Sequence, residues 1–289
     1  MHECPAMKLL LLCLLAWLSL SALPARAADP CPALRMQTRS ADQATRIAAF
    51  ACAENHAWFR SFIDADGRSS GQPVYEAEND ALADGMVAWK KVARYWKDSG
   101  LSDECTTTAT ACRSFVIDTP WSAAFVSWVM RRAGVRGFTG SARHVDYVRA
   151  ASRDTARSPY RIIAPDRGAP AAGDMLCYVR ANARVIGYQG LLARMEGDPG
   201  LPMHCDIVVA AEPGGMAWLV GGNVQQAVTL RMLRLDERGY LMNLPLRTGA
   251  DAKCSPDAPG QCNLNRQDWV ALLKLRTDAR DSMLATARG

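Results

Sequence analysis

Apolar side chains recur at helical spacing through the first half of the chain. Between residues 41 and 63, and again between residues 79 and 97, they return every three or four positions, as at Ile47, Phe50 and Trp58. Glycine and small polar residues follow each segment, where a helix is expected to end. Each spacing therefore predicts an amphipathic helix.

The stretch TPWSAAFVSWVMRRAG, residues 119–134, predicts a third helix. It is apolar on nearly every side until its two arginines, which is typical of a helix that is buried all round. Thr119 suits the N-cap, Pro120 the first helical position and Gly134 the stop. The threonine-rich residues 102–113 before it predict an exposed loop.

Beyond residue 160 the apolar positions form short runs between turn residues, and some alternate. This pattern predicts strands within 170–180, 203–212, 216–220 and 227–234. A final helix is predicted over 265–275. Short strands with tight turns that follow a helical half predict an α+β fold with an antiparallel sheet.

Composition narrows the class of protein. The chain has 289 residues, 49% of them hydrophobic and 22% charged, which excludes a disordered chain. Its net charge of +5 comes from interspersed basic and acidic residues that form no basic run. Nucleic acid is therefore not an expected partner. The length favours one or two domains.

Residues 1–27 are typical of a cleavable signal peptide. A lysine precedes an apolar run from Leu9 to Leu20, and Ala25-Arg26-Ala27 has small residues where signal peptidase cleaves. The run is shorter than the roughly 20 residues that span a bilayer, so no permanent membrane anchor is expected. The alternative is an uncleaved anchor. The chain is expected to be exported, to a periplasm or beyond the cell.

Eight cysteines follow the signal, and an even number in an exported chain favours disulfides. Short loops favour the pairs Cys105–Cys112 and Cys254–Cys262. Elimination then gives the pairs Cys31–Cys52 and Cys177–Cys205. The sequence has no CxxC pair and no histidine at ligand spacing from a cysteine. Neither a metal site nor a cofactor is therefore expected.

Three separated residues have side chains suited to acyl transfer. Ser122 falls in the first turn of the predicted buried helix, where free N–H groups stabilise an oxyanion. His204 begins a predicted strand and is the expected base, and Asn223 follows two glycines as its orienter. Each has a structural alternative: a capping or packing serine, a structural histidine and a turn asparagine.

Short motifs along the chain are similar to those of one bacterial family. They are YEAEND at 75–80, VARYW at 92–96, PWSAAFVSWVM at 120–130, SARHVDY at 141–147, GDMLCYVR at 173–180, HCDIVVA at 204–210 and GGNV at 221–224. Through them, residues 72–235 resemble the bacterial domain-of-unknown-function-2272 family. The helix, the two strand motifs and GGNV also resemble papain-like amidases and peptidases of the CHAP and NlpC type.

The resemblance implies a papain-like α+β fold, with a helix packed on an antiparallel sheet and an N-terminal helical extension. The expected divisions are a signal at 1–27, a helical region at 28–113, the papain-like domain at 114–250 and a tail at 251–289. It also implies hydrolysis of amide bonds in peptidoglycan peptides or a similar peptide or cell-wall substrate. The sequence leaves the oligomeric state open.

The chain departs from the papain-like families at the nucleophile, because Ser122 occupies the position of their cysteine. A serine needs stronger base assistance than a thiol does, usually with a carboxylate behind the histidine. Asp206 is two residues from His204 and is the candidate carboxylate. The alternative is a degenerate site that only binds. Further candidates are His144, Tyr147 and Trp121.

Overall fold

The structure is a computed structural model of the 289-residue chain. It describes residues 28–71, 74–75, 79–102, 104–106, 108–153, 158–180, 185–241, 243–247 and 254–276. The expected signal peptide, residues 1–27, lies outside the described residues. Within the described ranges, no helix has the length and apolarity needed to cross a membrane.

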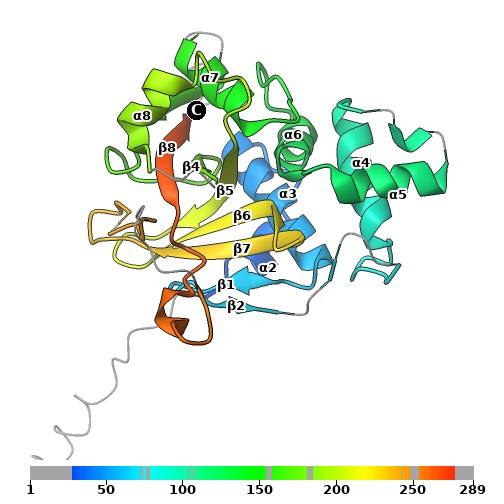
Figure 1. Cartoon of the computed structure of the whole chain (residues 1–289), viewed down its shortest axis with the longest axis horizontal. Helices are drawn as coiled ribbons and strands as arrows, with labels where there is room; N and C mark the ends of the chain where they lie inside the picture. The colour runs from blue at the N-terminus through cyan, green and yellow to red at the C-terminus, as the bar shows by residue number, and fades with distance from the viewer. Residues whose placement is uncertain are drawn as a thin grey trace, which may run out of the picture.

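One open sheet of eight strands organises the described part of the chain (Figure 1). Its order is β2-β1-β7-β6-β5-β4-β8-β3, and only the pairing of β1 with β7 is parallel. The strands are β1 Phe62–Ile63, β2 Ser69–Ser70, β3 Tyr160–Ile163, β4 Met175–Val179, β5 Met203–Ala211, β6 Met216–Val224, β7 Ala227–Arg234 and β8 Asp268–Leu275. The α+β fold with a mostly antiparallel sheet is confirmed.

Helices cover the sheet and extend beyond it. They are α2 Cys31–Leu34, α3 Gln43–Ala57, α4 Ala88–Ser99, α5 Ala109–Asp118, α6 Ser122–Arg132, α7 His144–Arg153 and α8 Gly187–Arg194, with short 3₁₀ turns at Glu104–Thr106 and Pro259–Gln261. Helices α3 and α6 contact β5 and β6, and α4 packs on α6. Figure 1 shows α4 and α5 on the side of the molecule away from α8.

Two hydrophobic cores lie on opposite faces of the sheet. Along β4, Met175 and Cys177 belong to the larger core, whereas Leu176 and Tyr178 belong to the smaller one. This alternation is what the two-residue period of a strand produces. Each helix from α2 to α8 contributes to the larger core. The helix-side face of the sheet is therefore the principal core.

The predicted strands are confirmed, and the predicted helix over 265–275 is wrong. That segment forms β8, which lies between β4 and β3 and is buried over most of its length. A strand buried on both faces has a continuous apolar run, which periodicity does not separate from a buried helix.

The helical half also differs from the prediction in its boundaries. The predicted loop over 102–113 is wrong from Ala109 onward, because the Thr108 side chain caps α5 by accepting the Ala111 N–H at 3.1 Å. Thr119 consequently ends α5 and does not cap α6. The helix expected from residue 79 begins only at Ala88.

All four predicted disulfides are present. They join Cys31 to Cys52, Cys105 to Cys112, Cys177 to Cys205 and Cys254 to Cys262. The first ties α2 to α3, and the third joins the neighbouring strands β4 and β5 within the larger core. Four disulfides are consistent with a protein of an oxidising compartment.

Candidate functional site

The first turn of α6 presents a serine together with free N–H groups. Trp121 occupies the N-cap without a side-chain hydrogen bond, and the first helical bond runs from the Phe125 N–H to the Trp121 carbonyl at 2.9 Å. Trp121 is anchored by stacking on Trp58, with 5.6 Å between the ring centroids. The serine, Ser122, therefore lies at a fixed helix start whose dipole favours negative charge.

His144, at the start of α7, is the histidine that contacts this serine. Its Nε2 lies 2.8 Å from Ser122 Oγ, and both side chains are buried. Tyr147, three residues later on the same helix, bonds His144 Nδ1 through its hydroxyl. When Nδ1–H donates to the tyrosine oxygen, Nε2 is free to accept the serine proton. In this tautomer, Ser122 and His144 have the contact geometry that a nucleophile and its base require.

Burial holds the pKa of His144 well below the ordinary value for histidine, and the nearby His204 and Arg180 lower it further. His144 is therefore neutral at neutral pH. A neutral imidazole is the form that accepts a proton. The same positive surroundings oppose the imidazolium that forms during proton transfer, so His144 is a weak base.

His204, near the start of β5, is held by partners other than Ser122. Arg180 bonds its Nδ1, and because a guanidinium only donates, Nδ1 must accept. The ring proton is then on Nε2, which donates to Asp206 Oδ1 at 2.7 Å. Burial lowers the pKa of His204, although Asp206 opposes this shift. Both nitrogens of a neutral His204 are therefore occupied.

Asp206 connects this histidine to a second arginine. Arg231 on β7 donates its Nε–H to Asp206 Oδ2 at 2.9 Å and also donates to the Asn265 side chain at 2.8 Å. Burial opposes ionisation of Asp206, but His204 and Arg231 hold the pKa of its carboxyl well below the usual range. The carboxylate stays charged and fixes the orientation of His204.

The two histidine systems lie side by side. The ring centroids of His144 and His204 are 5.0 Å apart. Among the described residues, no hydrogen bond joins Ser122 to His204, so the base expected from the sequence is not the one in contact with the serine. The structure places the second-tier candidates His144 and Tyr147 in the contacts expected of base and orienter, and it pairs Asp206 with His204.

The two glycines of GGNV permit close packing on both faces of β6. A Cβ on Gly221 would lie 1.9 Å from Asp206 Oδ1, and one on Gly222 would lie 2.5 Å from the Cβ of Phe125. Asn223 follows with φ 55°, at the irregularity between β6 and β7. In the described part of the chain, no hydrogen bond joins Asn223 to His204. Asn223 thus lies within β6 with a left-handed backbone that asparagine tolerates, and its orienting role stays a prediction.

Sequence reasoning missed the two arginines of the site. Arg180 ends the GDMLCYVR motif, and Arg231 is a charge in the middle of an otherwise apolar strand segment. A lone charge in such a strand indicates a buried ionic partner, and this signal was available in the sequence. Within the described residues, no three His, Cys, Asp or Glu side chains are grouped to hold a metal ion.

Comparison with known proteins identifies one family. The model of a family described as "Uncharacterized protein conserved in bacteria (DUF2272)" matches residues 83–275. That range includes both histidines, both arginines and the serine of the site. No curated protein and no solved structure matches the chain.

Proposed function

Because the chain belongs to the DUF2272 family of bacterial proteins, and because Ser122 and His144 form a buried nucleophile–base pair, we propose that it is an exported amide-bond hydrolase. The 2.8 Å contact between Ser122 Oγ and His144 Nε2 at a helix start is the observation that carries the proposal. A helix packed on an antiparallel sheet supports a papain-like arrangement. The papain-like pattern would make His204 the base, whereas the histidine in contact with Ser122 is His144.

The reaction would use the side chains in two stages. As Ser122 Oγ attacks the amide carbon, its proton passes to His144 Nε2, and the oxyanion forms beside the first-turn N–H groups of α6. The C–N bond then breaks, and His144 gives the proton to the leaving amine. In the second stage, His144 takes a proton from water as its oxygen attacks the acyl carbon. The bond from that carbon to Ser122 Oγ then breaks, the acid leaves, and His144 returns the proton to Oγ.

Tyr147 and His204 would act through His144 and not on the substrate. In the proposed reaction the tyrosine oxygen would accept the Nδ1–H of His144, which holds the ring with Nε2 toward Ser122. His204, locked by Arg180 and Asp206, supports the ring of His144 from the side at 5.0 Å between centroids. Both are positioning residues in this proposal.

The expected substrate is a peptide of the bacterial cell wall. Support comes from the predicted signal peptide and from the four disulfides, which are consistent with an oxidising compartment outside the cytoplasm, where a wall peptide would be within reach. The net charge of +5 is compatible with an anionic wall surface.

The second candidate is a degenerate module that binds wall fragments without cleaving them. Burial favours it, because Ser122 is only 4% exposed and His204 is fully buried. The hydrogen bond at His144 Nδ1 also favours the degenerate module, because it is made with the Tyr147 hydroxyl and not with a carboxylate that would stabilise an imidazolium.

Digestion of purified peptidoglycan by the disulfide-bonded protein separates the two candidates, with release of new amino termini as the measurement. The variants are Ser122→Ala, Ser122→Cys and the control Ser127→Ala, which removes another buried serine of α6. The hydrolase predicts release by the wild type and by Ser127→Ala but none by Ser122→Ala.

Release by Ser122→Cys alone would show a site whose only lost part is the nucleophile, which is the degenerate module. Equal release by the wild type and by Ser122→Ala would overturn the assignment of Ser122. An absence of release by every variant, with wall fragments still bound, would also overturn hydrolysis.

A further inference from the structure

A cavity of about 560 Å³ lies at the end of the sheet away from Ser122. It is bounded by the β5–β6 turn, the last residue of β7 and the β1–β2 turn. His204 is near the start of β5 and Glu212 follows its end, so the length of the strand separates the cavity from the candidate site by about 25 Å. The volume is in the range of small-molecule sites.

The floor of the cavity is apolar and adaptable. Met216 on β6, Met232 on β7 and Phe62 on β1 line it, and each is only partly buried. Methionine side chains are flexible and polarisable, and they fit aliphatic groups of varied shape. A ligand with a hydrocarbon stem is therefore suited to this floor.

The rim of the cavity has an excess of negative charge. Three of its four charged side chains are acidic, and one of these, Asp66, is paired both with Arg234 of the lining at 2.8 Å and with the neighbouring Arg68 at 3.3 Å. Asp64 Oδ1 accepts the N–H groups of Asp66 and Arg68, which fixes its carboxylate at the turn. Among the described residues, no cation is paired with Asp64 or with Glu212.

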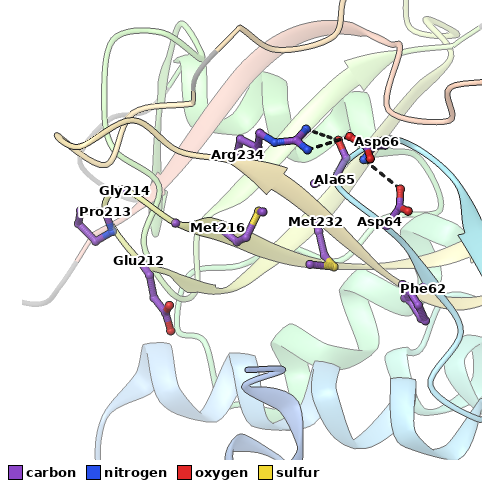
Figure 2. A pocket seen from close by; sticks show the side chains of 11 residues that line it. Phe62, Asp64, Ala65, Asp66, Glu212, Pro213, Gly214, Met216, Met232 and Arg234 are labelled. Carbon is purple, nitrogen blue, oxygen red and sulfur yellow. Dashed lines mark hydrogen bonds and ion pairs between the residues drawn. The ribbon is translucent and has the colours of Figure 1, made fainter. Parts of the chain in front are cut away.

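The two unpaired carboxylates lie at opposite ends of the floor. Figure 2 shows Glu212 on one side and Asp64 on the other, with Met216 and Met232 between them. The chain as a whole has a net charge of +5, so the negative charge of this lining is opposite in sign to that of the whole molecule. The arrangement matches a cation–hydrocarbon–cation pattern.

We propose that the cavity binds an aliphatic diamine, with one ammonium beside Glu212, the other beside Asp64 and the methylene chain on the methionine floor. A free diamine and a lysine-like residue with an unblocked α-amine share this chemistry. The site is independent of the proposed hydrolase, because none of its lining residues belongs to the Ser122 site.

Binding is measured by titrating 1,5-diaminopentane into the disulfide-bonded protein at low salt and following its NMR spectrum. Pentylamine, 1,5-pentanediol and lysine amide serve as comparison probes. The variant Glu212→Lys reverses one rim charge, and Glu237→Lys makes the same charge change on an exposed residue outside the lining.

We expect resonances of Met216 and Met232 to shift with the diamine, more weakly with pentylamine and not with the diol. Glu212→Lys is expected to weaken binding roughly tenfold, whereas Glu237→Lys changes it little, and added salt weakens binding in the wild type. Tighter binding of lysine amide than of the free diamine would indicate a peptide source, and the reverse a free diamine. Equal binding of the diol, equal loss in both variants, or no shift at the methionines would overturn the proposal.

Discussion

At the scale of single residues, hydrogen-bond chemistry assigns different tasks to two adjacent histidines. Arg180 can only donate, which fixes the proton of His204 on the nitrogen that faces Asp206. Among the residues that the structure describes, His144 has hydrogen bonds to the hydroxyls of Ser122 and Tyr147 and to no charged group. Of the histidines in the described ranges, His144 is the one whose ring nitrogen contacts Ser122, so the proposed catalysis depends on the histidine without a charged hydrogen-bond partner there.

Both histidines have pKa values lowered by burial, which predicts an acid-sensitive fold. The pKa of histidine in an unfolded chain is about 6.5. Below that pH these histidines bind protons in the unfolded state but not in the native state, where burial lowers their pKa. Their contribution to stability is complete above about pH 6.5 and is lost toward the folded pKa, at about 1.4 kcal/mol per pH unit for each histidine.

The test compares urea unfolding of the wild type and of His144→Gln at several pH values between 7.5 and about 5. The comparison is needed because the raised pKa values of the buried Glu54 and Asp174 act in the opposite direction over this window. We expect the wild type to lose more stability than His144→Gln as the pH falls. Parallel curves would contradict a buried neutral His144.

At the scale of elements, β6 is shaped by what approaches it from both faces. Gly221 leaves room for the Asp206 carboxylate, and Gly222 leaves room for Phe125 of α6. Two glycines at the end of one strand thus set the spacing between the helix that carries Ser122 and the sheet that carries His204. The two glycines of the GGNV motif therefore allow this close packing.

Gly221→Ala and Gly222→Ala are each predicted to destabilise the protein by about 1–3 kcal/mol or more, because the added methyl overlaps atoms that cannot move freely. Gly197→Ala is the control, since nothing lies within 4 Å of its added Cβ, and it should change stability by less than about 0.5 kcal/mol. Thermal unfolding of the three variants measures this. Equal midpoints would contradict the close approach at β6.

The sequence predicted the elements whose pattern is local. β4, β5 and β7 have apolar runs bounded by turns, and the start of α6 was recognised within a few residues. β8 was mistaken for a helix because its apolar run is continuous, and its central place depends on pairing with distant strands.

The candidate site was predicted less well, because its contacts are not local. Ser122, His204 and Asp206 were identified by residue type and spacing. The choice of His144 over His204 as the contact of Ser122 depends on how α7 folds over β5, which no pattern in the chain specifies. The bond between Arg180 and His204 likewise joins residues that are distant in the sequence, so it appears only in the folded structure.

At the scale of the whole molecule, disulfides tie together elements that already share a core. Cys177 and Cys205 face each other on β4 and β5, with 28 residues of separation, whereas Cys254 and Cys262 close a loop of separation 8 near the surface. Cys205 of the buried pair is next to His204 on β5. Loss of this pair should therefore disturb both the stability and the site.

Replacing Cys177 and Cys205 by alanine is predicted to cost about 3–4 kcal/mol of unfolding free energy, and the same change at Cys254 and Cys262 about 2–3 kcal/mol, from loop entropy alone. The lost buried contacts increase the first cost further. Denaturant unfolding of the two double variants provides the comparison. A larger loss for the surface pair would contradict the place given to Cys177–Cys205 in the core.

The central claim is that His144 activates Ser122 for attack on an acyl group. The most direct measurement is the rate of covalent labelling by a fluorophosphonate, with the modified residue located by mass spectrometry in the wild type, His144→Gln and His204→Gln. Activation of Ser122 by His144 predicts a single adduct on Ser122, no adduct in His144→Gln, and slower labelling of the same residue in His204→Gln. An adduct on another residue, or labelling that survives in His144→Gln but is lost in His204→Gln, would contradict it.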